Sequence, residues 1–182
     1  MPRYVALFRG INVGKAKRIA MADLRKLLEK LGYTGVKTLL NSGNAVFTGA
    51  AGATSGHAER IRAAVAKKLG VDAVVVVKSA QEVAGILAGN KLGKLASDPA
   101  RLLVAVTDQS AVLAGLEAVA SRDWGTEKLH LGKHAAYIWC ANGILESQAL
   151  TAVMKGLAGA GTTRNWATLG KIHDLLAETD GS

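Results

Sequence analysis

The spacing of apolar residues along the chain predicts an alternation of short strands and amphipathic helices. Leu24, Leu27, Leu28 and Leu31 repeat at the spacing of one helix face. Residues 74–77 are four valines, a run too short for a helix and typical of a buried strand. In the first half we expect strands at residues 4–8, 36–40, 45–48 and 73–77, and helices at residues 21–31 and 59–69. This β-α-β-β-α-β order predicts a ferredoxin-like unit, with both helices on one face of an antiparallel sheet.

The second half of the chain nearly repeats this order. A capping box from Ser79 to Glu82 opens a helix that runs to about residue 88. We then expect a strand at 101–107, a helix at 111–120 capped by Asp108, a hairpin of strands 128–131 and 135–140 turning at Gly132-Lys133, and helices at 147–157 and 166–177. Residues 159–165 stand where a last strand would come, and we expect the final helix to replace the sixth element of this unit.

The repeated order predicts an α+β fold. We expect two tandem ferredoxin-like units of the β-α-β-β-α-β type with antiparallel sheets, plus a C-terminal helix. The first unit is predicted at residues 1–79 and the second at residues 80–182.

Charge is distributed unevenly along the 182 residues. The formal net charge is +9, and residues 1–37 carry nine basic but only two acidic side chains. Such a concentration of cations attracts anionic partners and is the electrostatic signature of nucleic-acid binding. The alternative interpretation is a solvated surface that keeps the protein soluble.

Hydropathy and cysteine content favour a cytoplasmic protein. The sequence has no run of 18 apolar residues, and the apolar run near its start is too short for a signal peptide. Cys140 is the only cysteine, so an intramolecular disulfide is impossible and a reducing compartment fits. We expect this thiol to be buried and unreactive. We expect no cofactor and no contact with a membrane.

A glycine-containing loop follows the first predicted strand and partly matches a phosphate-binding P-loop. The segment Gly10-Ile11-Asn12-Val13-Gly14-Lys15 is one residue shorter than that motif. Ala16 stands where the motif has a magnesium-binding hydroxyl, so a nucleotide triphosphatase is not expected. A loop of this kind can still hold an anion, although a flexible, solvated loop is the alternative. Its basic side chains are Arg9, Lys15, Lys17 and Arg18.

Two further polar motifs lie at the ends of predicted elements. Residues 41–44, Asn-Ser-Gly-Asn, are a hairpin turn in which glycine and asparagine would supply positive φ, and Ser42 and Asn44 are candidates to face a site. Before the last helix, Asn165 is a natural N-cap, and Arg164 adds a guanidinium suited to phosphate or carboxylate. The alternative for Arg164 is a structural salt bridge or carbonyl clamp, and Trp166 is expected to anchor the helix in the core.

Several functional classes have no support in the sequence. The four histidines are dispersed, no metal-binding motif is present, and no nucleophile motif occurs. The third predicted strand has a single aromatic residue, Phe47, so it lacks the signature of an RNA-recognition motif. Any contact with nucleic acid would therefore depend mainly on charge.

Three motifs together make the sequence resemble a known family. RYVALFRGINVGK at residues 3–15, NSGNAVF at residues 41–47 and TTRNW at residues 162–166 are similar in order and spacing to the bacterial domain-of-unknown-function family 1697. The resemblance covers about residues 3–176 and implies two tandem ferredoxin-like units, with no established activity. The chain departs from the family at Lys15, where a second glycine is usual.

The function best supported by the sequence is binding of a phosphorylated or nucleic-acid ligand. Basic side chains of the first loop would neutralise the ligand, and polar side chains of all three motifs would orient it. An enzyme acting on a small anionic substrate remains an alternative, without a recognised base or nucleophile. A second alternative is an interaction protein whose motifs are purely structural. The candidate site residues are Arg9, Asn12, Lys15, Lys17, Arg18, Ser42, Asn44, Arg164 and Asn165.

Overall fold

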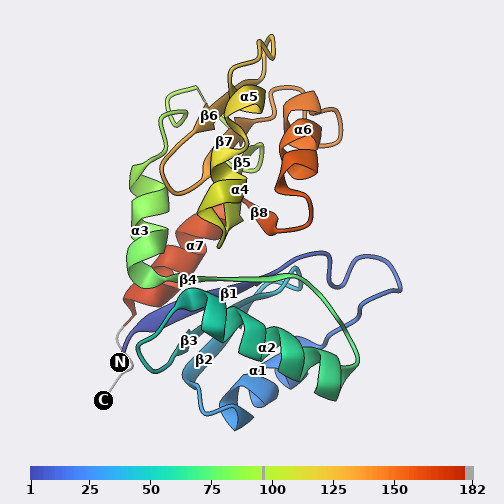
Figure 1. Ribbon diagram of the computed structural model, residues 1–182, viewed down its shortest axis with the longest axis vertical. Helices are drawn as coiled ribbons and strands as arrows, with labels where there is room; N and C mark the ends of the chain where they lie inside the picture. The colour runs from blue at the N-terminus through green and yellow to red at the C-terminus, as the bar shows by residue number, and fades with distance from the viewer. Residues whose placement is uncertain (96, 179–182) are drawn as a thin grey trace. The chain divides into compact units, whose positions relative to one another are not determined.

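The computed structural model describes residues 1–95 and 97–178, which form two compact units (Figure 1). The first unit holds Met1–Gln81 together with residues 172–178, and the second holds Glu82–Lys171. Each unit has a four-stranded antiparallel sheet and its own hydrophobic core. The predicted α+β fold of two ferredoxin-like units with a C-terminal helix is therefore confirmed. The division of the chain into domains at residues 1–79 and 80–182 stays a prediction.

The first unit has the β-α-β-β-α-β order predicted from the sequence. Its elements are β1 (Arg3–Phe8), α1 (Met21–Lys30), β2 (Thr34–Leu39), β3 (Asn44–Thr48), α2 (Thr54–Leu69) and β4 (Val75–Ser79). The strands lie in the order β2-β3-β1-β4, and α1 and α2 cover one face of this sheet (Figure 1). Tyr4, Ala6 and Phe8 alternate along β1 and join the core beneath the helices. Val5 and Leu7 are also buried, which explains why β1 is a continuous apolar run.

The helices of the first unit match their predicted faces. Leu24, Leu27 and Leu28 of α1 are buried, as the periodicity indicates. Helix α2 begins at Thr54, five residues before the prediction. Its first turn contains serine and glycine, which a helix accepts there because the first N–H groups have no partner within the helix.

The second unit is built on a sheet of order β6-β7-β5-β8. The elements after β4 are α3 (Ala80–Ala88), β5 (Leu102–Thr107), α4 (Ser110–Ala114), α5 (Glu117–Ala120), β6 (Lys128–Leu131), β7 (Ala136–Trp139), α6 (Gln148–Leu157), β8 (Gly161–Asn165) and α7 (Trp166–Ala177). Leu103, Ile138, Val153 and Leu157 belong to the core between this sheet and its helices. Helices α3 and α7 each contribute residues to both units.

The sixth strand of the second unit is present, so the prediction of a helix in its place was wrong. Strand β8 pairs antiparallel with β5 from Gly161, opposite Thr107, to Asn165, opposite Leu103. Strand β8 has mostly polar residues and therefore lacks the apolar pattern by which strands were predicted. Its two adjacent threonines nevertheless suit a strand at the edge of a sheet. Gly161 is required by this pairing, because a Cβ there would lie 2.5 Å from the carbonyl oxygen of Val106.

Two local predictions in the second unit also need correction. The helix expected at 111–120 is divided into α4 and α5, and its N-cap is Gln109 instead of Asp108. The side chain of Thr107, two residues before that cap, accepts the N–H of Gln109 at 3.1 Å. The β6–β7 hairpin turns one residue later than expected. The backbone N–H of Gly132 donates to the carbonyl oxygen of Ala135 at 2.8 Å, so the turn itself is formed by the two residues between them.

Tyr137 of β7 is enclosed within the second unit. The residue is 1% exposed, and its hydroxyl donates a hydrogen bond to the carbonyl oxygen of Ile86 in α3. Gly89 and Gly132 leave room for it, because a Cβ at Gly89 would lie 2.8 Å from the hydroxyl and one at Gly132 would lie 3.0 Å from the ring. Burial raises the pKa of Tyr137 to about 12.

We expect Tyr137 to make the protein less stable as the pH rises from about 10 to about 12. The unfolded chain loses the phenolic proton near its ordinary pKa of about 10, whereas the folded chain keeps it, so the free energy of unfolding falls across this window. Across the whole window the free energy of unfolding falls by about 2–3 kcal/mol. Urea unfolding of the wild type and of Tyr137→Phe should be measured between pH 9 and 11.5. The free energy of unfolding of the wild type should fall relative to that of the variant as the pH rises. A constant difference between the two proteins would contradict this assignment.

Candidate functional site

The loop between β1 and α1 is held in one conformation by Asn12. The side-chain nitrogen of Asn12 donates to the carbonyl oxygens of Ile19 at 2.9 Å and Asn41 at 2.8 Å. Its side-chain oxygen accepts the N–H of Ile19 at 2.8 Å, and its own backbone N–H donates to the carbonyl of Lys17 at 2.9 Å. The amide therefore closes the base of the loop and ties it to the β2–β3 turn. Both side-chain N–H groups of Asn12 serve the fold.

The backbone of this loop has an unusual run of φ angles. The φ angle is positive at Gly10, Asn12 and Gly14, which are alternate residues. Alternation in the sign of φ directs successive N–H groups toward one side, as in the concave turns that bind phosphate. Arg18 donates to the carbonyl oxygens of Asn12 at 3.3 Å and Gly14 at 3.2 Å, which holds its guanidinium against this turn.

The basic side chains of the loop are accessible. Lys15, Lys17 and Arg18 are exposed, and Arg9 is half-buried. The pKa of Asp72 is lowered mainly by a hydrogen bond from Arg62 and more weakly by the positive charge of Lys17. The predicted cations Lys15, Lys17 and Arg18 therefore lie together at the surface of one braced loop.

The first unit carries most of the basic excess of the chain. Residues 1–81 and 172–178 contain 14 basic and six acidic side chains, whereas residues 82–171 contain nine basic and seven acidic ones. The potential that attracts anions is therefore centred on the unit that holds the loop.

The β2–β3 turn packs against the end of β1. The N–H of Phe8 donates to the carbonyl of Gly43 at 2.9 Å, and the N–H of Gly43 donates to the carbonyl of Leu40 at 3.3 Å. Positive φ occurs at Leu40 and Gly43, so the expectation that an asparagine of this turn supplies it was wrong. The turn and the basic loop are thus joined by backbone contacts and by Asn12.

The two polar side chains predicted in this turn have different surroundings. Asn44 is 1% exposed and donates to the carbonyl of Leu39 at 2.8 Å and to the hydroxyl of Ser42 at 3.2 Å. Ser42 is exposed. Asn44 therefore braces the turn from inside, and Ser42 is the member of the pair at the surface.

Arg164 and Asn165 belong to the second unit. Arg164 is 8% exposed on β8 and donates to the hydroxyl of Thr162 at 3.0 Å and the carbonyl of Thr163 at 2.8 Å. Burial lowers its pKa to about 10. Asn165 accepts the N–H of Thr168 at 2.8 Å, which confirms it as the N-cap of α7. The contacts of Arg164 are those of a structural clamp, and anion binding by this residue stays a prediction.

The sequence reasoning missed a buried carboxylate at the start of α6. Glu127 is 7% exposed and accepts the N–H groups of Gln148 at 3.0 Å and Ala149 at 3.3 Å, together with the hydroxyl of Ser147. Ser147 in turn accepts the N–H of Leu150 at 3.0 Å and is the N-cap. No local pattern signals this, because Glu127 lies 20 residues before Ser147.

The environment of Cys140 agrees with the prediction of a buried thiol. Burial raises its pKa, and a hydrogen bond involving Ser147 acts in the opposite direction. A raised pKa leaves little thiolate at neutral pH, so the group is a poor nucleophile.

Two other kinds of site find no support within residues 1–95 and 97–178. No three His, Cys, Asp or Glu side chains in these ranges gather into a group that could hold a metal ion. Phe47 lies in the helix-side core, with its ring 4.4 Å from that of Tyr33 and 5.6 Å from that of Tyr4. It is therefore not presented to nucleic-acid bases.

No helix in the described part of the chain is both long and apolar enough to cross a membrane.

Comparison with known proteins points to one family. The model of a family described as "Protein of unknown function (DUF1697)" matches residues 1–137, a range that includes the loop and the β2–β3 turn. The conserved bacterial protein SP0830 from Streptococcus pneumoniae has a similar structure, with a TM-score of 0.79 and 26% sequence identity. The match covers 96% of this chain and 98% of that chain. No curated protein matches the sequence.

Proposed function

Because the chain belongs to the DUF1697 family, whose function is unknown, we propose a function from its own geometry: the first unit binds phosphate-bearing ligands through residues 9–18. The observation that carries this proposal is the bracing of the loop by Asn12. A braced loop does not lose conformational entropy when a ligand arrives, so its cations bind without the cost of ordering a flexible segment.

Charge and backbone geometry support the same ligand class. Lys15, Lys17 and Arg18 are exposed beside a backbone whose φ alternates in sign, and Arg9 flanks it. Ammonium and guanidinium groups neutralise phosphate, while backbone N–H groups supply directional hydrogen bonds. Nucleotides and nucleic-acid strands share this chemistry, and phosphate is therefore the group assigned to the loop.

The buried pair of Ser147 and Glu127 does not extend this proposal to catalysis. Both side chains are buried, and their hydrogen bonds are made to each other and to the N-terminus of α6. They act as a helix cap, so the binding function is the one that the geometry supports.

We expect a fluorescent 12-nucleotide oligothymidylate to bind at low salt and to lose affinity steeply as salt is added. If four cations contact phosphates, the slope of log K against log salt is about −3, which is a loss of roughly 60-fold between 50 and 200 mM. Lys15→Ala with Lys17→Ala should reduce the slope to about −1.4. Asn12→Ala should weaken binding although it changes no charge. Fluorescence polarisation measures both effects.

A matched control separates the loop from the overall charge. Lys133→Ala with Lys155→Ala removes the same two charges from exposed positions in the second unit. This control should bind the oligonucleotide nearly as the wild type does, and equal losses in both double variants would refute the proposal. Competition by pyrophosphate and by ATP then shows whether a short phosphate group suffices or a strand is needed.

A further inference from the structure

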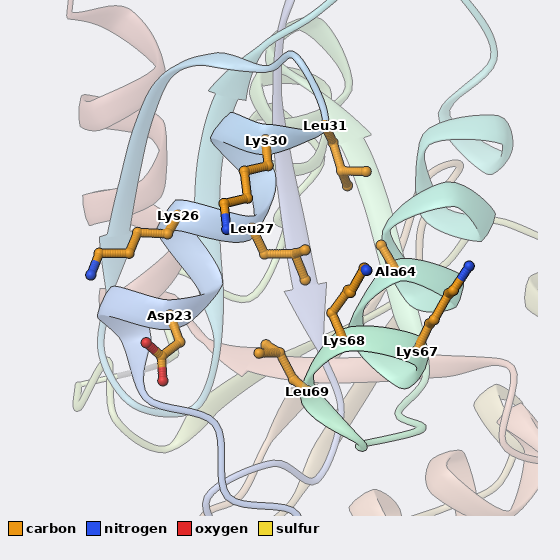
Figure 2. A pocket seen from close by; sticks show the side chains of 9 residues that line it. All are labelled: Asp23, Lys26, Leu27, Lys30, Leu31, Ala64, Lys67, Lys68 and Leu69. Atoms are coloured by element: carbon orange, nitrogen blue, oxygen red, sulfur yellow. The ribbon is translucent and has the colours of Figure 1, made fainter.

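A groove with a volume of about 570 Å³ lies between α1 and α2 of the first unit (Figure 2). Its apolar lining comes from Leu27 on α1, from Leu31 at the C-cap of α1, and from Ala64 and Leu69 on α2. Leu27 belongs to the core, and the other three are partly buried and pack against it. The floor of the groove is therefore a continuation of the hydrophobic core to the surface.

Cations flank this apolar floor on both sides. Lys26 and Lys30 come from α1 and lie one turn apart, and Lys67 and Lys68 come from the last turn of α2. In Figure 2, Lys30 and Lys68 stand beside the groove, whereas Lys26 and Lys67 extend outward from its two sides. Asp23 is the acidic member of the lining. The rim thus combines four positive charges with one negative charge.

We propose that this groove docks an acidic amphipathic helix of a partner protein. An apolar seam between two helices accepts the apolar face of a third helix, as in the helix-in-groove mode of recognition. Cations on both sides of the seam correspond to the flanking positions of a coiled coil, where they pair with acidic residues of the partner. The partner helix therefore carries leucine-like residues on one face and glutamate or aspartate along both edges of that face.

The apolar floor distinguishes this partner from other anions. A phosphate backbone gains affinity from cations alone and makes no use of leucine side chains at the base of a groove. A membrane surface binds apolar side chains that project outward, whereas these side chains line a hollow. A helix supplies both the apolar ridge and the flanking charges that the groove complements.

The test uses the intact protein and a designed, fluorescein-labelled peptide of 16 residues. The peptide has leucine at i, i+3, i+4 and i+7 spacing and glutamate on both edges of that face. We expect saturable binding by fluorescence anisotropy, and at least tenfold weaker binding to Lys30→Glu with Lys68→Glu. A peptide with lysine in place of glutamate should bind this double variant more tightly than it binds the wild type, as charge pairing at the rim predicts.

Three controls make the test decisive. Lys133→Glu with Lys155→Glu makes the same charge change on the second unit and should leave peptide affinity within twofold. Lys15→Ala with Lys17→Ala should also leave it unchanged, which separates this groove from the phosphate-binding loop. A peptide with serine in place of leucine should not bind, and thermal melts show that each variant is folded.

Several outcomes would overturn the proposal. These are absence of peptide binding to the wild type, equal binding of a scrambled peptide, or full binding to the Lys30 and Lys68 double variant. An oligothymidylate or a phosphatidylglycerol vesicle that requires Lys30 and Lys68, while the peptide does not bind, would assign the groove to that partner instead.

Discussion

Gly43→Ala is expected to destabilise the protein by about 3–5 kcal/mol, the largest effect of a single methyl group in the first unit. Gly43 has φ of 90°, a conformation that costs an L-residue about 1–2 kcal/mol. A Cβ there would also lie 2.6 Å from Cδ1 of Ile11 and 2.8 Å from Cβ of Phe8. The Cβ of Phe8 is fixed to the backbone of β1, so this clash is relieved only by moving the turn away from the strand.

Gly14→Ala provides the matched control for this substitution. Gly14 has φ of 61°, but a Cβ there would meet no atom within 4 Å. This variant should therefore lose only about 1–2 kcal/mol, because it carries the backbone strain without the clash. Urea unfolding followed by far-ultraviolet circular dichroism measures both changes. Equal losses would mean that the turn does not pack against Phe8 in solution.

The element order was predictable because its signals are local. The leucine spacing of α1 and the cap and bounds of α7 depend on residues close together in the chain. Strand β8 was not predictable in this way. Its residues are mostly polar, and its strand conformation follows from pairing with β5, which lies more than fifty residues earlier.

The candidate site was predictable in its charges but not in its bracing. Arg9, Lys15, Lys17 and Arg18 stand out in the sequence because they cluster beside glycines. Asn12 was expected to orient a ligand, yet its side chain bonds to Ile19 and to Asn41, which is 29 residues away. Such bonds arise from the approach of two loops in the fold, and no local pattern records them.

The second large effect is expected at Glu127, whose carboxylate caps α6 from a distant part of the chain. Glu127→Ala should cost about 3–4 kcal/mol, because it leaves the N–H groups of Gln148 and Ala149 and the hydroxyl of Ser147 without their acceptor in a buried place. Glu127→Gln keeps one acceptor oxygen but removes the negative charge that favours a helix N-terminus. It should therefore cost about 1–2 kcal/mol.

Glu146→Ala is the matched control, because Glu146 is an exposed acid immediately before the same helix cap. It removes the same charge near the same helix end, and it should cost no more than about 0.5 kcal/mol if buried hydrogen bonds, not charge alone, make Glu127 important. All three tryptophans lie within Glu82–Lys171, so urea unfolding followed by tryptophan fluorescence reports on the unit that contains α6. If Glu127→Ala and Glu146→Ala lower the free energy of unfolding by similar small amounts, the carboxylate of Glu127 acts only as a nearby charge. A loss several times larger in Glu127→Ala, with Glu127→Gln between the two, would establish it as the acceptor on which the start of α6 depends.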